Sequence, residues 1–201
     1  MVMENKLNIT NQAELKKVEE KISKQKAKQL FETGEIDRVE VGTFKGLAQI
    51  HKVLFEDIYD FAGQIRKVNI AKGNFRFAPL AYLDAAIANI DKMPQTTFDE
   101  IVEKYIEMNI AHPFREGNGR SMRIWLDLMF KKGIRKVIDW SLVSREDYFS
   151  AMERSVVKDI EIKHLLKNAL TDKINEQAIF MKGIDMSYYY EGYNEYKTEE
   201  I

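Results

Sequence analysis

The sequence predicts a single domain built mainly of α-helices, arranged as a bundle and carrying one short β-hairpin. Apolar residues recur at helical spacing along most of the 201 residues, and only 3 prolines and 10 glycines interrupt them. Between residues 64 and 78 this period breaks, and a Gly-Asn pair separates two short apolar stretches, as in a hairpin. The length is sufficient for one sizeable core, so we expect one domain over residues 1–201.

The first two helices follow from their caps and their apolar spacing. One is expected to begin at Thr10 or Asn11 and to end at Gly34. Its second face is rich in Lys and Glu, which indicates a solvated surface. The next helix is expected from about Thr43. Its apolar residues at helical spacing are Phe44, Leu47, Ile50, Leu54, Phe55 and Ile58.

Later elements are marked by turn and capping residues. A helix is expected after Pro79, and Thr97 with Glu100 forms a capping box that opens another. That helix must stop at His112, because Pro113 lacks an N–H and restricts the residue before it. The expected boundaries of the remaining helices are a C-terminal cap at Gly133, an N-terminal cap at Ser144, the range Asp159 to Leu170, and a short helix between Asp185 and Gly192.

Composition excludes several classes of function. A net charge of −1 gives no support for binding nucleic acid or an anionic membrane. The absence of cysteine removes disulfides, thiolate catalysis and cysteine metal sites, and it fits a reducing cytoplasm, where we expect the protein. No signal peptide or membrane span is predicted.

Residues 112–123 concentrate the groups that can do chemistry. Gly117 to Gly119 form a loop that leads into a helix, whose unpaired N–H groups and dipole suit a phosphate. Arg120 and Arg123 share a face of that helix, and two guanidinium groups favour a polyphosphate. Glu116 can hold a divalent cation that bridges phosphates, and His112 is a candidate general base. The stretch predicts phosphate-ester chemistry on a nucleotide.

A solvated turn and helix with two surface arginines is the alternative, because Asn-Gly is a common turn pair and His-Pro a common helix stop. The joint occurrence of base, carboxylate, turn and arginines favours the nucleotide site. His51 and His164 lie within expected helices without a partner at ligand spacing, so both are interpreted as structural.

The same stretch resembles a known family. The fixed positions His112, Phe114, Glu116, Gly117, Asn118, Gly119, Arg120 and Arg123 resemble the complete signature of the Fic (filamentation induced by cAMP) domain family. Residues 47–63 resemble the family's early helix and residues 69–79 its flap hairpin, so the resemblance covers roughly residues 40 to 170. It implies a Fic-like helical bundle with a short β-hairpin flap.

The resemblance implies transfer of AMP from ATP to a Tyr, Ser or Thr hydroxyl of a target protein. His112 would deprotonate that hydroxyl, and Glu116 would bind Mg²⁺, with Ca²⁺ or Mn²⁺ as alternatives. Arg120 is expected near the β-phosphate and Arg123 near the γ-phosphate. Gly117, Asn118 and Gly119 complete the expected nucleotide site. The relatives called Doc phosphorylate instead and typically carry Lys where Gly119 stands, so Gly119 favours nucleotidyl transfer.

The flap is expected to dock the target by adding a strand to it, with a simple loop clamp as the alternative. Its residues are Ile70, Ala71, Lys72, Gly73, Asn74 and Phe75.

Near the end of the chain, Ser187 to Gly192 resemble the family's inhibitory motif: Ser or Thr, three residues, Glu, then Gly or Asn. In the family this helix, expected here around 185–192, directs its Glu to the second motif arginine. Glu191 would then occupy the Arg123 guanidinium, as in the self-inhibited, single-domain class III. A tyrosine-rich tail packed on the core is the alternative. Tyr188 is a candidate for self-modification, because it begins the expected helix, where burial with Glu191 is least expected.

A self-inhibited protein adenylyltransferase is therefore the preferred function. One alternative is an enzyme that removes AMP with a water positioned by Glu191, alone or in addition to transfer. Another is a catalytically silent nucleotide-binding regulator, against which the intact His112 argues. The target and the oligomeric state, including a homo-oligomer, stay open.

Overall fold

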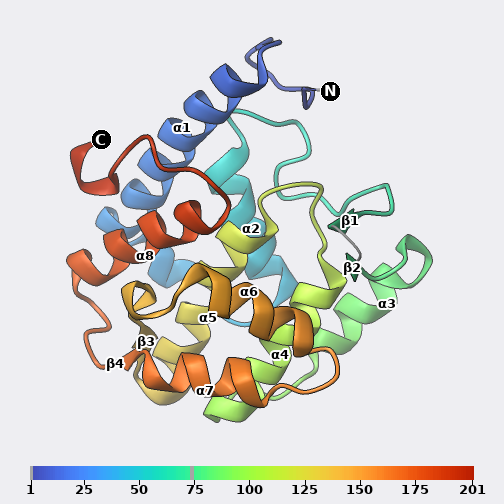
Figure 1. Ribbon diagram of the computed structural model, residues 1–201, viewed down its shortest axis with the longest axis vertical. Coiled ribbons are helices and arrows are strands. Elements are labelled where there is room, and N and C mark those ends of the chain that lie inside the picture. Colours follow the sequence, from blue (N-terminus) through green and yellow to red (C-terminus); the bar gives the residue numbers. More distant parts are fainter. Residues whose placement is uncertain (1, 73–74) are drawn as a thin grey trace.

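A computed structural model describes residues 2–72 and 75–201. This part of the chain forms eight α-helices and two small antiparallel sheets, which confirms the mainly α-helical prediction (Figure 1). The helices are α1 (Gln12–Glu32), α2 (Phe44–Phe55), α3 (Leu80–Asp91), α4 (Phe98–Ala111), α5 (Asn118–Ile134), α6 (Arg145–Arg154), α7 (Ile160–Asn168) and α8 (Gln177–Tyr190). Among the described residues, no helix combines the length and the apolarity needed to cross a membrane.

The two sheets are each a pair of two-residue strands. Strand β1 (Ala71–Lys72) pairs with β2 (Phe75–Arg76), which confirms the expected hairpin. The Gly73-Asn74 pair, on which this prediction was based, lies outside the described residues. Strand β3 (Val137–Ile138) pairs with β4 (Leu170–Thr171) and was not predicted from the sequence.

Side-chain caps start the helices where the sequence predicted. Asn11 accepts hydrogen bonds from two amides of the first turn of α1, and Thr43 and Ser144 each accept one from α2 and α6. Thr97 and Glu100 form the full capping box of α4. Helix α4 ends at His112, as Pro113 requires, and this places the candidate base at a helix terminus.

Helix α5 is the centre of the bundle and packs against α2, α4 and α8. Trp125, Leu126 and Phe130 on this helix are completely buried. Because α5 is enclosed on several sides, its N-terminal turn is held in a fixed position by the core.

Two predicted helix boundaries were wrong. Gly133 lies inside α5, and the left-handed cap is Arg135, with a φ of 57°. A Cβ on Gly133 would lie 2.9 Å from the carbonyl oxygen of Gln95, so this glycine permits close packing and does not end the helix. Helix α8 begins at Gln177, well before Asp185, which lies within it.

The Lys- and Glu-rich face of α1 was also predicted wrongly, because part of it is an interior surface. Glu19, Glu20 and Lys24 are 1–2% exposed. Lys24 pairs with Glu20 at 3.1 Å and with Asp185 of α8 at 3.0 Å. The charges on this face are therefore paired with one another and with groups of α8 and the segment that follows it.

Candidate active site

The loop at Gly117 and the first amides of α5 form a site suited to an anion, which we call the anion cradle. Gly117 adopts a left-handed conformation with a φ of 78°, and it provides no side chain to cap the helix that follows. The first amides of an α-helix have no acceptor within it, so those of Asn118, Gly119 and Arg120 face outward at the positive end of the dipole. This confirms the predicted geometry of a loop that feeds a helix N-terminus.

The Asn118 side chain is part of the loop's own framework. Its Oδ1 accepts from the Phe114 amide at 2.8 Å, and its Nδ2 donates to the Phe114 carbonyl at 2.7 Å. Since this amide is buried and both its oxygen and its nitrogen are bonded to the Phe114 backbone, we assign the backbone N–H of Asn118 to a phosphate. The Phe114 ring is buried and stacks on His51, which confirms that Phe114 anchors the loop.

His51 has a structural role, as predicted, and it also fixes the loop. One ring nitrogen lies 2.8 Å from the Glu116 carbonyl oxygen, and the other accepts from the Gly63 amide at 2.9 Å. The nitrogen facing the carbonyl must therefore carry the proton. Burial, partly opposed by this bond, lowers the pKa of His51 to about 4, so the ring stays neutral.

His112 is oriented to act as a base. Its Nδ1 lies 3.3 Å from the carbonyl oxygen of Asn109. A carbonyl only accepts, so Nδ1 carries the proton and Nε2 is left with a free lone pair. Its ring stacks on Phe77 at 3.6 Å between centroids. Burial lowers the pKa of His112 to about 3, so at neutral pH the ring is neutral and its Nε2 lone pair carries no proton.

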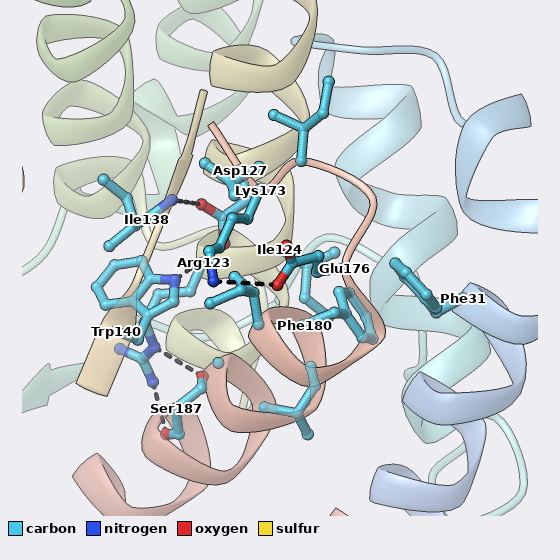
Figure 2. Close-up of a pocket in the computed structure, with 15 residues that line it drawn as sticks. Phe31, Arg123, Ile124, Asp127, Ile138, Trp140, Lys173, Glu176, Phe180 and Ser187 are labelled. Carbon is cyan, nitrogen blue, oxygen red and sulfur yellow. Dashed lines mark hydrogen bonds and ion pairs between the residues drawn. The ribbon is translucent and has the colours of Figure 1, made fainter. Parts of the chain in front are cut away.

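Arg123 turns from α5 toward α8 and is 2% exposed. Its Nε donates to the Ser187 hydroxyl at 2.7 Å, and its Nη2 donates to the Ser187 carbonyl at 2.9 Å and to Glu191 Oε1 at 3.0 Å. Figure 2 shows the Arg123 guanidinium reaching Ser187. The structure thus brings Glu191 to Arg123 across 68 positions, as the resemblance implied, and adds a contact with Ser187 that was not predicted.

The Glu191 carboxylate lies over the anion cradle. A Cβ built on Gly119 would come within 2.5 Å of Glu191 Oε1 and 3.0 Å of both terminal nitrogens of Arg123. Glu191 Oε2 also accepts from Lys72 of the flap at 3.3 Å. Burial raises the pKa of Glu191, but Arg123 and Lys72 outweigh it and the pKa falls to about 2. An ionised carboxylate therefore fills the position that suits a phosphate.

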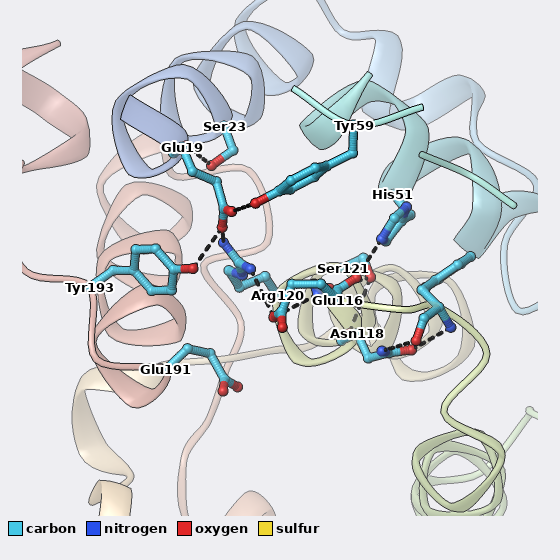
Figure 3. A network of polar contacts seen from close by, with 12 residues as sticks. Glu19, Ser23, His51, Tyr59, Glu116, Asn118, Arg120, Ser121, Glu191 and Tyr193 are labelled. Carbon is cyan, nitrogen blue, oxygen red and sulfur yellow. Dashed lines mark hydrogen bonds and ion pairs between the residues drawn. The ribbon is translucent and has the colours of Figure 1, made fainter. Parts of the chain in front are cut away.

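Arg120 turns the other way, toward α1, and is 1% exposed (Figure 3). Its Nη1 pairs with Glu19, which also accepts from the hydroxyls of Tyr59 and Tyr193. The aromatic rings of Phe55, Tyr188 and Tyr193 pack around this guanidinium, with centroids 4.6–5.2 Å from its central carbon. Arg120 and Arg123 therefore have separate partners in this structure, although the sequence placed them on one helix face.

Glu116 is the residue at which a cation could be held. Its side chain is 44% exposed, and its Oε1 accepts from the Gly117 amide at 2.9 Å and from Arg120 at 3.2 Å. Oε2 keeps its lone pairs. Among the described residues there is no cluster of three His, Cys, Asp or Glu side chains suited to a metal. The donor set fits Mg²⁺, which usually takes one or two carboxylates and completes its shell with phosphates and water.

The small cavity nearest Arg123 is not a nucleotide site. It lies between α5 and α8, is lined by Asp127, Trp140 and Phe180 among others, and has a volume of about 40 Å³ (Figure 2). That space admits only a few water molecules. The cradle under Glu191, by contrast, combines the amides of a helix N-terminus with the Arg123 guanidinium, which suit a larger anion.

The flap lies beside His112 and Glu191. Lys72 on β1 reaches Glu191, and Phe77, just after β2, covers His112. The backbones of β1 and β2 pair only with each other among the described residues. The positions named for target docking that the structure describes, Ile70 to Lys72 and Phe75, thus form a short ribbon at the edge of the site.

Tyr188 does not have the surroundings that the sequence suggested. It is 1% exposed, whereas Tyr189 is 48% exposed. Tyr188 was preferred as an acceptor because little burial was expected there. This expectation was wrong while α8 is docked, because α8 begins earlier than expected and buries this face.

Sequence reasoning missed Glu19, Tyr193 and Arg66. Glu19 and Arg120 are 101 positions apart, so no local pattern links them. Arg66, 3% exposed, donates to the His112 carbonyl at 2.9 Å, and nothing in the local sequence distinguishes it from a surface arginine.

Comparisons with known proteins agree with this site. Residues 43–130 match the Fic/DOC family. Protein adenylyltransferase VbhT of Bartonella schoenbuchensis is 31% identical over 199 residues, which cover 92% of this chain and 40% of that protein. The chain thus spans about two fifths of the length of this relative. The probable protein adenylyltransferase Fic of Escherichia coli is 26% identical, covering 87% of this chain and 90% of that protein.

Solved structures share the fold. The BepC protein of Bartonella tribocorum, crystallised with bound AMPPNP, superposes with a TM-score of 0.67 at 16% identity, covering 85% of this chain and 93% of that one. The range 43–130 that matches the family model contains His112, the loop at Gly117 and both arginines. The helical fold of the chain agrees with the fold of these structures. Residues 43–130 of the chain thus belong to the Fic/DOC family.

Proposed function

We propose that the protein is a self-inhibited adenylyltransferase that moves AMP from ATP to a Tyr, Ser or Thr hydroxyl of a target protein. One observation carries this proposal. The ionised Glu191 lies against Gly119 and Arg123, so an anion already occupies the cradle that the helix N-terminus and the guanidinium make. The names of the relatives, and the nucleotide in the BepC structure, support ATP as the donor.

In the proposed reaction His112 Nε2 accepts the proton of the target hydroxyl, whose oxygen attacks the α-phosphorus. The P–O bond to the β-phosphate breaks, and pyrophosphate leaves. The amides of the α5 N-terminal turn hold phosphate oxygens, and Arg123 holds the γ-phosphate once Glu191 has left it. Glu116 would hold Mg²⁺, which neutralises phosphate charge when bound. Arg120 reaches the β-phosphate only if its guanidinium leaves Glu19, so we place it at the rim of the site.

Glu191 and the residues 185–192 around it act as the inhibitory element in this proposal. With Glu191 on Arg123, a γ-phosphate meets a carboxylate and ATP cannot place its phosphates for attack. Gly119 favours nucleotidyl transfer over kinase chemistry because the resemblance places Lys here in the relatives that phosphorylate. The lack of a side chain also leaves room for the docked Glu191, since a Cβ would lie 2.5 Å from its Oε1.

Labelled ATP tests the proposal. Wild type, Glu191→Gly and Glu191→Gly with His112→Ala are incubated with cell lysate and either α- or γ-labelled ATP. We expect protein labelling from the α-label only, strongest in Glu191→Gly and lost with His112→Ala. Labelling from the γ-label would establish kinase chemistry. No labelling from either nucleotide, with ATP binding retained, would favour the silent regulator.

Removal of AMP is a second candidate, because Glu191 is a 19% exposed carboxylate beside the cradle and could position a water. Incubation of AMP-labelled target with the wild type and Mg²⁺ or Ca²⁺ separates the two activities. Loss of label that depends on Glu191 would establish removal.

A further inference from the structure

A single buried arginine connects the candidate base to both arms of the flap. Arg66 is 3% exposed and lies between α2 and β1. Its Nε donates to the His112 carbonyl at 2.9 Å, and its Nη1 donates to the Val68 carbonyl at 2.7 Å. Its Nη2 donates to the carbonyls of Ala78 and Ala111. Among the described residues, none of its partners is a carboxylate.

The position of this cation explains why it is tolerated without a carboxylate. Ala111 and His112 are at the C-terminus of α4, where the last carbonyls have no partner within the helix and the dipole is negative. Burial lowers the pKa of Arg66, yet an arginine remains charged because its normal value is so high. The negative end of the helix dipole therefore stabilises the guanidinium charge, and the guanidinium provides hydrogen-bond donors for the last carbonyls of the helix.

His112 needs such a partner, because its backbone is left-handed, with φ 48° and ψ 64°. This conformation costs a residue with a Cβ about 1–2 kcal/mol. The residue before a proline is also normally extended. The bond from Arg66 Nε to the His112 carbonyl, together with that from the Arg66 amide to the Pro113 carbonyl at 2.8 Å, holds the peptide in place. The direction of the His112 ring depends on this backbone.

The same guanidinium ties down the flap. Val68 precedes β1 and Ala78 follows β2, so the bonds to their carbonyls cross-link the two arms at their base. The Ala78 amide donates to the Ile110 carbonyl of α4 at 2.9 Å, and the Phe77 ring stacks on the His112 ring. Flap and base are thus fixed to one group.

We propose that Arg66 is a positioning residue that sets the distance and angle between the flap and His112, so that a hydroxyl delivered on the flap meets Nε2. The inference rests on the proposed function. Arg66 touches neither nucleotide nor target in this scheme. Its loss should therefore lower the kcat for transfer to a target while the KM for ATP stays unchanged.

Arg66→Lys is the variant of choice, because it keeps the charge and much of the length but cannot reach four carbonyls as a planar fork does. Arg38→Lys, at an exposed arginine, is the matched control. Both are made with Glu191→Gly, and AMP transfer to the target is followed at varied ATP. We expect kcat to fall on the order of 10²-fold for Arg66→Lys, as expected from a displacement of about 1 Å, with no change for Arg38→Lys. An unchanged kcat, or an equal rise in the KM for ATP, would overturn the proposal.

Amide hydrogen exchange separates this inference from the proposed function, because it needs no catalysis. In Arg66→Lys the amide of Ala78 should exchange at least tenfold faster, whereas amides of α5 keep their protection. In the wild type, the Arg66 Nε–H should exchange far more slowly than that of Arg38, and this requires no variant to fold. If Arg66 Nε–H exchanges like Arg38, or Ala78 keeps its protection, the inference is wrong even where AMP transfer is observed. If the protection changes as expected but Glu191→Gly transfers no AMP, the proposed function fails and the structural link stands.

Discussion

The buried pair between Glu19 and Arg120 should make a large contribution to stability at neutral pH. Glu19 accepts hydrogen bonds from Arg120, Tyr59 and Tyr193, and the Arg120 side chain is completely buried. In Glu19→Gln the guanidinium loses its buried anion and keeps only the half-exposed Glu116, at 3.2 Å. Removing one partner of a buried pair typically costs about 3–5 kcal/mol. For a chain of this size 1 kcal/mol shifts Tm by roughly 2–4 °C, so we expect a loss of about 6–20 °C.

Thermal unfolding followed by circular dichroism measures this, with Glu14→Gln as the control on the exposed first turn of the same helix. A surface change of this kind should alter stability by no more than ~0.5 kcal/mol. A Tm for Glu19→Gln within about 2 °C of the wild type would show that the pair does not stabilise the fold.

The pH dependence gives a second check on the same residue. Burial raises the pKa of Glu19, but Arg120 and the two tyrosine hydroxyls outweigh it, so the pKa lies below the ordinary value of 4.5. A group with a lowered pKa stabilises the folded state above its unfolded pKa and loses this effect as the pH falls through the folded value. The difference in Tm between wild type and Glu19→Gln should therefore be full at pH 7 and shrink below about pH 4.5. A difference that stays constant to pH 3 would contradict the assignment of charge.

Four further outcomes concern activity. His112→Ala in the Glu191→Gly background should lower AMP transfer by ~10²–10⁴-fold while calorimetry finds ATP binding retained. Glu191→Gly should raise labelling by roughly ten- to a hundredfold, because a charged hydrogen bond is worth about 1.5–3 kcal/mol; an unchanged rate would reduce the C-terminal contact with Arg123 to packing. Since the pKa of His112 is lowered to about 3 and loss of the Glu191 charge lowers it further, the activated enzyme should keep its rate from pH 8 down to pH 6; a tenfold fall over this range would indicate a base with an ordinary pKa. Peptide mass spectrometry after incubation with ATP should find self-modification at Tyr188 only once α8 has left its site, because the phenol is buried; an adduct on the half-exposed Tyr189 alone would contradict this order.

The features of this protein that the sequence predicted correctly depend on residues that are close together in the chain. The capping box of Thr97, the stop at Pro113 and the loop at Gly117 each depend on residues within four positions of one another. The predicted contact between Glu191 and Arg123 is long-range, and it came from the resemblance to a family.

The parts that the sequence did not predict depend on partners far away in the chain. A stretch of Lys and Glu has the same periodicity whether water or α8 covers it, so the pattern alone predicts a solvated face for Glu19 and Lys24. Arg66 donates its hydrogen bonds to main-chain carbonyls. Every residue has such a carbonyl, so the sequence does not show which ones Arg66 contacts. The true start of α8 lacks a side-chain cap, because Glu176 at the N-cap accepts no hydrogen bond from the first turn.

Three buried arginines surround the site, and each has its positive charge balanced by a different group. The identity of that group explains where regulation can act. Arg66 is held by carbonyls at the end of α4, and Arg120 by Glu19 of α1. The charge partner of Arg123 is Glu191, at the end of α8. Exchanging a carboxylate for a phosphate on Arg123 leaves a buried cation paired throughout, so this exchange should cost far less than exposing either of the other two.

An exchange this easy requires other contacts to keep the inhibitory segment in place when nucleotide is abundant. The structure provides them around Glu191. The Tyr190 carbonyl accepts from Arg145 at 2.9 Å, the Tyr190 hydroxyl donates to the Val143 carbonyl, and Tyr193 donates to Glu19 at 2.7 Å. Glu191→Gly should therefore free Arg123 without releasing α8. Its Tm should fall by no more than about 12 °C, since the charged hydrogen bond is worth about 1.5–3 kcal/mol and each kcal/mol shifts Tm by roughly 2–4 °C. A far larger loss would mean that activation proceeds by undocking of the whole segment and not by removal of one carboxylate.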